Sequence, residues 1–212
     1  SSSCPDNKTV EGKYEHCYKC NKSLQFNPGF YNASKDKISE KQKRYNDNPH
    51  NVYLAYFSDE IIKVGTSHHQ RTLKRLKEQG ARSAIILQSC SNAYTARELE
   101  EYVVKNHLKI KEKVTVNKKL PCLLKNPYNP TNANKLLFSA KEEISKKRKD
   151  ILNQEPTFID FEDKYFTSDF VFKGPIKDIS NSLPLIIQGR GMGIVGNVLI
   201  LKDQDLVAFP LC

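Results

Sequence analysis

The 212-residue chain is long enough for one sizeable domain and a smaller one. Its 34 lysines and arginines against 24 aspartates and glutamates give a formal net charge of +10, so polyanions are its natural partners. The alternative is that the lysines only confer solubility, and composition alone does not separate these two explanations. No apolar run approaches the roughly 20 residues that a membrane-spanning helix needs, so no membrane partner is expected.

The beginning of the sequence carries no recognisable secretory signal, which favours a cytoplasmic protein. Ser1 is not an initiator residue, and the only methionine is Met192. We therefore expect the sequence to be a fragment or a processed product that lacks residues upstream.

Three of the six cysteines lie within the first 20 residues. Cys17 and Cys20 have the spacing of a metal knuckle, in which one turn presents two thiolates to a tetrahedral zinc ion, and Cys4 would supply a third ligand. The fourth ligand stays open between His16 and a cysteine upstream of the first residue. A disulfide or a redox-active cysteine pair is an alternative, but the expected secretory or βαβ context is missing. The pattern favours a structural zinc site that replaces the missing hydrophobic core of residues 1–35.

Residues 36–120 are expected to form a compact α/β module, and its clearest pattern of helices and strands runs from His50 to about Asn117. The expected order is a polar helix, two strands, a helix that ends at Gly80, a third strand and another helix. The expected bounds of these six elements are Lys37–Asn46, Asn51–Phe57, Ile61–Gly65, Thr66–Gln79, Arg82–Gln88 and Asn92–Leu108. After the polar helix, the β-β-α-β-α order predicts a small mixed sheet with flanking helices.

The first two strands are expected to form a hairpin with a three-residue loop. Such a loop places Phe57 opposite Ile61. It also places Ala55 opposite Lys63, so that Tyr53 and Lys63 lie on the same face of the hairpin.

The remainder of the chain is expected to form a connector with a charged helix (residues 121–155) and a small β domain (residues 156–212). The connector runs from Pro121 to Pro130, and the helix is expected at Asn132–Leu152. Five short strands are expected at Phe158–Phe161, Phe166–Phe172, Leu183–Gln188, Gly193–Leu201 and Leu206–Leu211. The glycine-rich run Gly189–Gly193 joins two strands, which indicates a hairpin turn instead of a phosphate-binding loop.

Polar side chains on the two longer helices of the central region are candidates for chemistry. On the first helix, Leu73 and Leu76 define the buried side. A basic stripe that suits phosphate lies opposite and consists of His68, Arg71 and Arg75. The alternative is an ordinary solvated helix face.

The second helix buries an apolar stripe of three residues, Ala96, Leu99 and Val103. Glu100 lies at the edge of this stripe, whereas Glu98 and Glu101 point away from it. A carboxylate at the edge of a groove suits a hard divalent ion such as Mg²⁺, which one or two carboxylates and water usually hold. An ordinary exposed carboxylate is the alternative.

This arrangement resembles the GIY-YIG nuclease superfamily. Its members carry a tyrosine in each of two paired strands, an arginine on the next helix and a metal-binding glutamate on a later helix. Tyr53 matches the first tyrosine, Arg71 or Arg75 matches the arginine, and Glu100 matches the glutamate by its place on the second helix.

Two positions depart from the pattern of the superfamily. Asn51 stands where the first motif has glycine, and Lys63 replaces the second tyrosine. The Lys63–Gly65 form resembles a divergent branch of the superfamily. The resemblance then implies that Tyr53 acts as the base or positions water, while Lys63 stabilises charge.

The whole chain resembles more closely a family of uncharacterised, mainly bacterial proteins, a domain of unknown function. The matching segments are the cysteine cluster that ends at Cys20, Phe26–Pro28, Tyr53–Phe57, Lys63–Ser67, Glu78–Ala81 and Gly193–Ile200. This resemblance implies a common fold and brings no established activity.

We therefore expect an α+β protein with an N-terminal zinc knuckle, a GIY-YIG-like module and a small C-terminal all-β domain. The superfamily resemblance implies divalent-metal-dependent cleavage of nucleic-acid phosphodiesters. Glu100 would hold Mg²⁺ or Mn²⁺, and an arginine of the basic stripe would bind the phosphate. The first alternative is a non-catalytic zinc-containing protein that binds DNA or RNA, and the second is a structural protein with a solubilising basic surface.

Overall fold

The computed structural model describes residues 17, 19–20, 38–107, 109–125, 128–148, 155–165, 176–178, 188–202 and 206–211. Cys4 lies outside these residues, as do the strand expected at Phe166–Phe172 and all but the last residue of the one expected at Leu183–Gln188. No helix in the described ranges combines the length and the apolar character that crossing a membrane requires.

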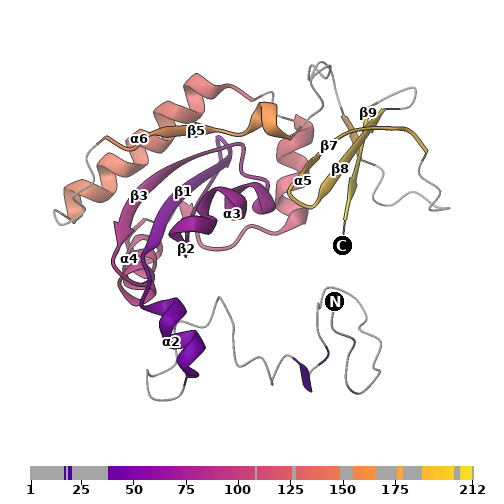
Figure 1. The fold of residues 1–212 in the computed structure, drawn as a ribbon. Coiled ribbons are helices and arrows are strands. Elements are labelled where there is room, and N and C mark those ends of the chain that lie inside the picture. Colours follow the sequence, from indigo (N-terminus) through magenta and orange to yellow (C-terminus); the bar gives the residue numbers. More distant parts are fainter. Residues whose placement is uncertain are drawn as a thin grey trace.

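A five-stranded mixed sheet forms the centre of the molecule, in the order β4-β2-β1-β3-β5 (Figure 1). The strands are β1 (His50–Ser58), β2 (Ile61–His68), β3 (Ser83–Cys90), β4 (Ile110–Lys111) and β5 (Phe158–Asp160). Neighbouring strands are antiparallel except β2 and β4, which are parallel. The predicted β-β-α-β-α order is confirmed, with α3 (Thr72–Gln79) after β2 and α4 (Ala93–Asn106) after β3.

The β1–β2 hairpin turns over two residues, Asp59 and Glu60. Ser58 pairs with Ile61, and Phe57 is the additional residue of a β-bulge. The predicted three-residue loop with Phe57 opposite Ile61 is therefore wrong, because the bulge absorbs one residue of the strand.

Beyond the bulge, the hairpin has the predicted register. Ala55 lies opposite Lys63, and Tyr53 lies opposite Gly65. Since residues two apart in a strand share a face, Tyr53 and Lys63 project from the same face of the sheet, as predicted.

Helix α3 begins later than the predicted residue Thr66, because β2 continues to pair with β1 as far as His68. The 3-10 turn η2 (His69–Arg71) then leads into the helix. The helix ends at Gly80 as predicted, and the φ angle of +73° at Gly80 is in the left-handed region that favours glycine.

Only one of the two leucines of α3 is buried. Leu76 is fully buried, whereas 54 % of Leu73 is exposed, so the predicted burial of Leu73 is wrong. Thr72 takes its place in the interior, since it lies one turn before Leu76 on the same side of the short helix.

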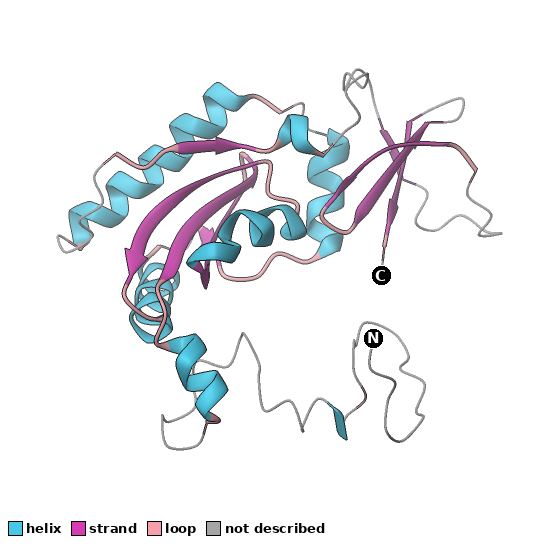
Figure 2. Cartoon of the chain, in the orientation of Figure 1, coloured by secondary structure: helices cyan, strands magenta, loops and turns pink. Residues whose placement is uncertain are grey.

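Helices cover both faces of the central sheet (Figure 2). Helices α4 and α6 (Pro130–Lys147) pack on one face, where the core includes Val52, Leu54, Ile85, Leu99 and Leu137. The other face contacts α3 and α5 (Val116–Lys125), and its core includes Tyr53, Phe57, Leu76, Leu120 and Phe161. The short helix α2 (Glu40–Asn46) precedes β1, and Ser39 caps it.

Helix α5 occupies part of the segment that was expected to be a connector. Pro121 lies inside this helix and removes one backbone hydrogen bond. Leu120 and Leu123 on either side are each only 5 % exposed, and their burial in the core offsets this loss. The charged helix α6 forms as predicted but ends at Lys147, five residues earlier than expected.

A second sheet contains the C-terminal strands in the order β6-β9-β8-β7. Its strands are β6 (Ile176–Asp178), β7 (Arg190–Val195), β8 (Val198–Lys202) and β9 (Leu206–Pro210). The expected single strand Gly193–Leu201 is instead a hairpin that turns at Gly196, whose φ angle is +58°. Most of the run Gly189–Gly193, which was expected to be a turn, belongs to β7.

The two sheets contribute to one hydrophobic core. Tyr53 and Phe57 of the central sheet pack in the same cluster as Val198 and Ile200 of the second sheet. The strand expected first in the C-terminal group, β5, pairs with β3 of the central sheet. The turns at Gly80 and Gly196 touch, since a Cβ atom added to Gly196 would lie 2.8 Å from the Gly80 nitrogen.

Candidate functional site

The Tyr53 side chain lies across β2 at the position of Gly65. A Cβ atom added to Gly65 would come within 2.6 Å of Tyr53 Oη, so only glycine leaves room for the ring. Tyr53 is 1 % exposed. The glycine of the Lys63–Gly65 segment therefore determines where the tyrosine hydroxyl lies.

A chain of hydrogen bonds links this hydroxyl to two helices. Gln79 Nε2 on α3 donates to Tyr53 Oη at 3.1 Å. Lys119 Nζ on α5 donates to the Gln79 carbonyl oxygen at 2.5 Å and lies 5.1 Å from the centre of the Phe57 ring. These contacts bring β1, α3 and α5 together on the face of the sheet from which Lys63 also projects.

Lys63 and Arg75, from two other elements, both act electrostatically on Lys119, and we call Lys63, Arg75 and Lys119 the cation cluster. Burial, with repulsion from Lys63 and Arg75, lowers the pKa of Lys119 to about 8. Burial also lowers the pKa of Lys63; Glu100 opposes this effect and Arg75 adds to it. Like charges held together in a half-buried place are unfavourable without an anion, which makes the cluster a candidate binding site.

Glu100 lies on the opposite side of β2. Thr66 Oγ1 donates to Glu100 Oε2 at 3.3 Å, and Arg97 Nη1 donates to the same oxygen at 2.9 Å. Glu100 is 5 % exposed, and burial raises the pKa of its carboxyl group while Arg97 lowers it. The predicted apolar stripe of α4 is confirmed, and Glu100 flanks it.

Arg97 forms ion pairs with three carboxylates. Besides Glu100, its guanidinium binds Glu101 at 3.1 Å and Glu112 at 3.0 Å. Among the described residues, no group of three or more histidine, cysteine, aspartate or glutamate side chains is placed to hold a metal ion. The cation at the centre of these carboxylates is thus a side chain of the chain itself.

The predicted basic stripe does not lie on one helix, because His68 ends β2, Arg71 ends η2 and only Arg75 is on α3. Its two arginines are partly neutralised. Arg71 and Arg75 both lie within ion-pair distance of Glu78, at 3.4 and 3.8 Å. About half of each arginine side chain remains exposed. Arg75 belongs to the cation cluster, whereas Arg71 lies in η2, just before α3 begins.

Three residues of the site were missed from sequence. The position of Arg97, three residues before Glu100 on a helix, could have indicated that the two side chains pair. Gln79 also carries a signal, since it directly precedes the glycine that ends α3. Lys119 lies on the unpredicted helix α5, and its place beside α3 follows only from tertiary packing.

The two described cysteines of the N-terminal segment lie close together. The Cys20 amide donates to Cys17 Sγ at 3.5 Å, which closes the Cys17–Cys20 loop. With Cys4 outside the described residues, the zinc site stays a prediction.

A family model described as "Protein of unknown function (DUF2797)" matches residues 3–209. The chain belongs to the DUF2797 family. The expected membership of a domain family of unknown function is confirmed, and the match spans the cysteine segment, both sheets and the cation cluster. No match was found among curated proteins or among solved structures. For this DUF2797 chain, the GIY-YIG resemblance stays a prediction.

Proposed function

We propose that the chain binds nucleic acid through its phosphates at the cation cluster of Lys63, Arg75 and Lys119. Burial and the nearby Lys63 and Arg75 lower the pKa of Lys119, and burial and Arg75 lower the pKa of Lys63. The observation that carries this proposal is that Lys63 and Lys119, held under this repulsion, have no carboxylate within ion-pair distance among the described residues. A bound phosphate would relieve the repulsion, because it brings negative charge and several acceptor oxygens to the three side chains.

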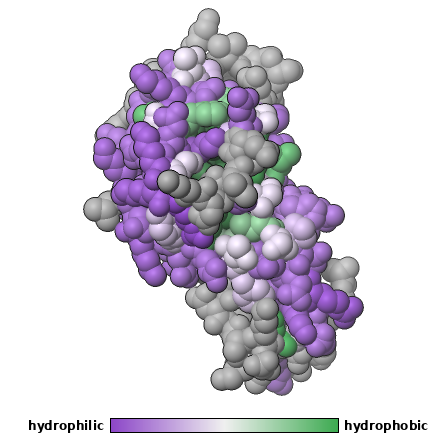
Figure 3. Space-filling view, turned by 90° about the vertical axis from the view of Figure 1, so that its left-hand side faces the viewer, coloured by the Kyte–Doolittle hydropathy of each residue, from purple (hydrophilic) through white to green (hydrophobic). Residues whose placement is uncertain are grey.

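Global charge supports the same partner. The formal net charge of +10 attracts polyanions over long distances and accelerates their association. Most of the face in Figure 3 that is not drawn grey is hydrophilic. A surface of this kind suits a backbone-binding protein better than one that buries an apolar partner.

Cleavage of the bound phosphodiester is the second candidate function. It is favoured by the Tyr53 hydroxyl beside the cation cluster and by Glu100, whose charge acts on Lys63 from across the strand. The carboxylate of Glu100 and the hydroxyl of Thr66 are oxygen donors of the kind that Mg²⁺ or Mn²⁺ prefers. Arg97 already binds that carboxylate, so the described arrangement does not fit a divalent ion, and we assign no step to one.

Binding is tested with labelled single- and double-stranded DNA and RNA by fluorescence anisotropy over a range of salt concentrations. Arg75→Ala is expected to weaken binding and to reduce the slope of log affinity against log salt by about 0.7–0.9, the contribution of one phosphate contact. Lys74→Ala is the matched control, because Lys74 is an exposed neighbour on the same helix. Equal effects of both variants, or no salt-sensitive binding by the wild type, would contradict the proposal.

Cleavage is tested with the same substrates in the presence of Mg²⁺, Mn²⁺ or a chelator. If the chain is a nuclease that uses Glu100, Glu100→Gln abolishes cleavage and preserves salt-sensitive binding. If the wild type and Glu100→Gln both bind nucleic acid and neither cleaves it, the result supports non-catalytic binding.

The zinc prediction is tested separately by metal analysis of the purified protein. We expect one zinc ion per chain, held by Cys4, Cys17, Cys20 and a fourth ligand. Replacement of Cys17 and Cys20 by serine should remove the zinc, and a full zinc content in that variant would refute the assignment.

A further inference from the structure

Four aromatic rings meet where α2 approaches the open end of the β1–β2 hairpin. The His68 ring stacks on Tyr45, with 5.3 Å between the ring centres and 25° between the planes. The His69 ring follows on His68, at 4.7 Å and 31°. We call Tyr45, His68 and His69 the ring stack. His50 meets Tyr45 and His68 edge-on, at 85° and 77°.

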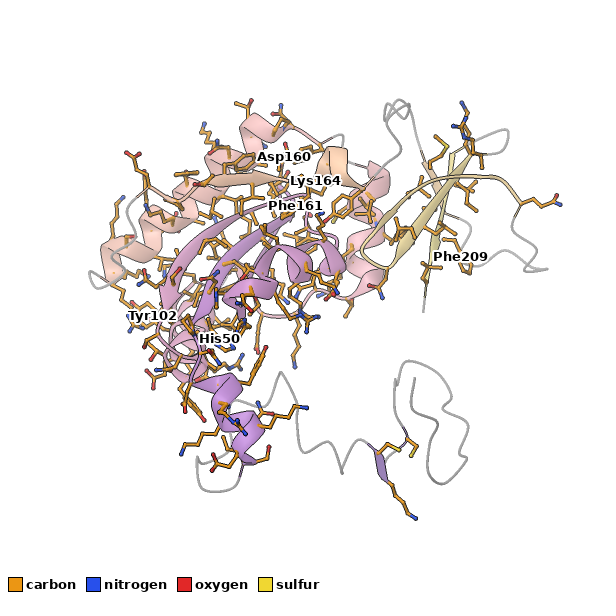
Figure 4. All side chains as sticks on the ribbon, in the orientation of Figure 1. His50, Tyr102, Asp160, Phe161, Lys164 and Phe209 are labelled. Carbon is orange, nitrogen blue, oxygen red and sulfur yellow. The ribbon has the colours of Figure 1, made fainter. Side chains whose placement is uncertain are left out.

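The ring stack is held in place by the interior of the protein. His50, at the start of β1, is fully buried, and its Nδ1 atom lies 2.8 Å from the Asn48 carbonyl oxygen (Figure 4). The His69 amide donates to the Pro49 carbonyl oxygen at 3.1 Å, and His69 Nδ1 lies 3.2 Å from the same oxygen. The orientation of the outer ring is therefore established before any ligand binds.

Exposure increases along the ring stack. Tyr45 and His68 are half-buried, and His69 is exposed. Arg71 follows two residues later with about half of its side chain exposed, and both Arg71 and Arg75 act electrostatically on Tyr45. Since Arg75 acts on Tyr45 and also belongs to the cation cluster, the ring stack and the cation cluster lie near each other.

We propose that the His69 end of the ring stack is a platform on which an unpaired nucleic-acid base stacks, so that the protein prefers single strands. This inference rests on the proposed binding of nucleic acid at the cation cluster. Proteins that bind single strands combine aromatic platforms for the bases with a basic path for the backbone. A base inside a duplex is covered on both faces by its neighbours, so it cannot stack on the platform.

The test compares fluorescently labelled oligo-dT with its duplex with oligo-dA at one salt concentration. His69→Ala is expected to weaken binding of the single strand at least about fivefold, the low end for loss of one stacked base, and to leave duplex binding unchanged. His69→Phe restores the platform and should restore the affinity. Gln70→Ala is the matched control, because Gln70 is the exposed neighbour of His69. Since His69 is itself exposed, its variants should retain the denaturation midpoint of the wild type.

A 2-aminopurine base within the oligo-dT strand reports stacking directly. Its fluorescence should be quenched by the wild type and by His69→Phe, and not by His69→Ala. Equal loss of single-strand and duplex binding in His69→Ala, or no loss of either, overturns the inference while the cation cluster remains a binding site. Wild-type affinity in Arg75→Ala and in Lys119→Met overturns the proposed function itself.

Discussion

Replacement of Lys119 by methionine is expected to stabilise the fold while it weakens the binding of nucleic acid. Methionine keeps the unbranched apolar stem and removes the charge that burial and two neighbouring cations disfavour. Since one pKa unit corresponds to about 1.4 kcal/mol, a decrease from 10.5 to about 8 corresponds to about 3 kcal/mol of unfolding free energy at pH 7.

Several contacts of the ammonium group reduce this gain. Lys119 donates a hydrogen bond to the Gln79 carbonyl oxygen, lies over the Phe57 ring and is partly exposed to solvent. We therefore expect Lys119→Met to raise the unfolding free energy by about 1–2 kcal/mol. For a chain of this size, that gain corresponds to an increase in Tm of about 2–8 °C.

The stabilising effect depends on pH in a defined direction. Below pH 8, Lys119 is protonated in both the folded and the unfolded chain, so the penalty is fully present. Between pH 8 and 10.5, the folded chain has lost this proton while the unfolded chain retains it, so the wild type gains stability relative to the variant. The advantage of Lys119→Met should therefore be largest near pH 7 and disappear above pH 10.5.

Chemical denaturation of both proteins at pH 7, 8, 9 and 10 measures this difference, and anisotropy measures binding at pH 7. Lys118→Met is the matched control, because Lys118 is the exposed neighbour on the same helix. The reasoning is refuted if Lys119→Met is less stable than the wild type at pH 7. It is also refuted if the stability difference does not change with pH.

Two further predictions concern the packing on either side of β2. Gly65→Ala should destabilise the fold by about 1–3 kcal/mol, because its Cβ atom would lie 2.6 Å from Tyr53 Oη. Gly191→Ala, whose Cβ atom would have no neighbour within 4 Å, should be nearly neutral, and urea denaturation compares the two; equal effects would contradict the packing role of Gly65. Arg97→Met should cost about 3 kcal/mol in the same assay, because it leaves Glu100 buried without its guanidinium partner, and a loss below about 1 kcal/mol would contradict this.

Much of the central region follows from local signals in the sequence. Continuous apolar runs give β1 and β3, and Gly80 ends α3 because few other residues adopt its left-handed backbone. The spacing of Ala96, Leu99 and Val103 gives the buried stripe of α4. These features depend on residues close in sequence, which is why they could be predicted.

The predictions that are wrong concern elements whose structure depends on contacts with segments far away in the sequence. The partner of β5 is a strand about 75 positions earlier, and nothing within Phe158–Asp160 identifies it. Helix α5 forms despite Pro121, because its leucines find an apolar surface on β1 and on the second sheet. Leu73 was expected in the core because it lies three positions before Leu76 on a helical wheel, whereas the buried side of α3 runs through Thr72 and Leu76.

In the candidate site, too, the contacts within a hairpin could be predicted and the contacts between distant elements could not. The shared face of Tyr53 and Lys63 follows from strand register, which the sequence pattern carries. The approach of Lys119 requires the packing of α5 against α3, and the neutralisation of Glu100 requires the actual rotamer of Arg97. The Lys119 contact comes from a different element, which a charge pattern on one helix cannot reveal, whereas the spacing of Arg97 and Glu100 on α4 could have indicated their pairing.

The core shared by the two sheets also affects how the chain folds as it leaves the ribosome. Phe57 and Val198 belong to the same cluster, although roughly 140 residues separate them. At about 5–20 residues per second, synthesis of that interval takes roughly 7–28 s. During this time one apolar face of β1 lacks the strands that cover it in the folded chain. Contacts of such high sequence separation slow folding, so the nascent β1–β2 hairpin is the segment that we expect molecular chaperones to protect.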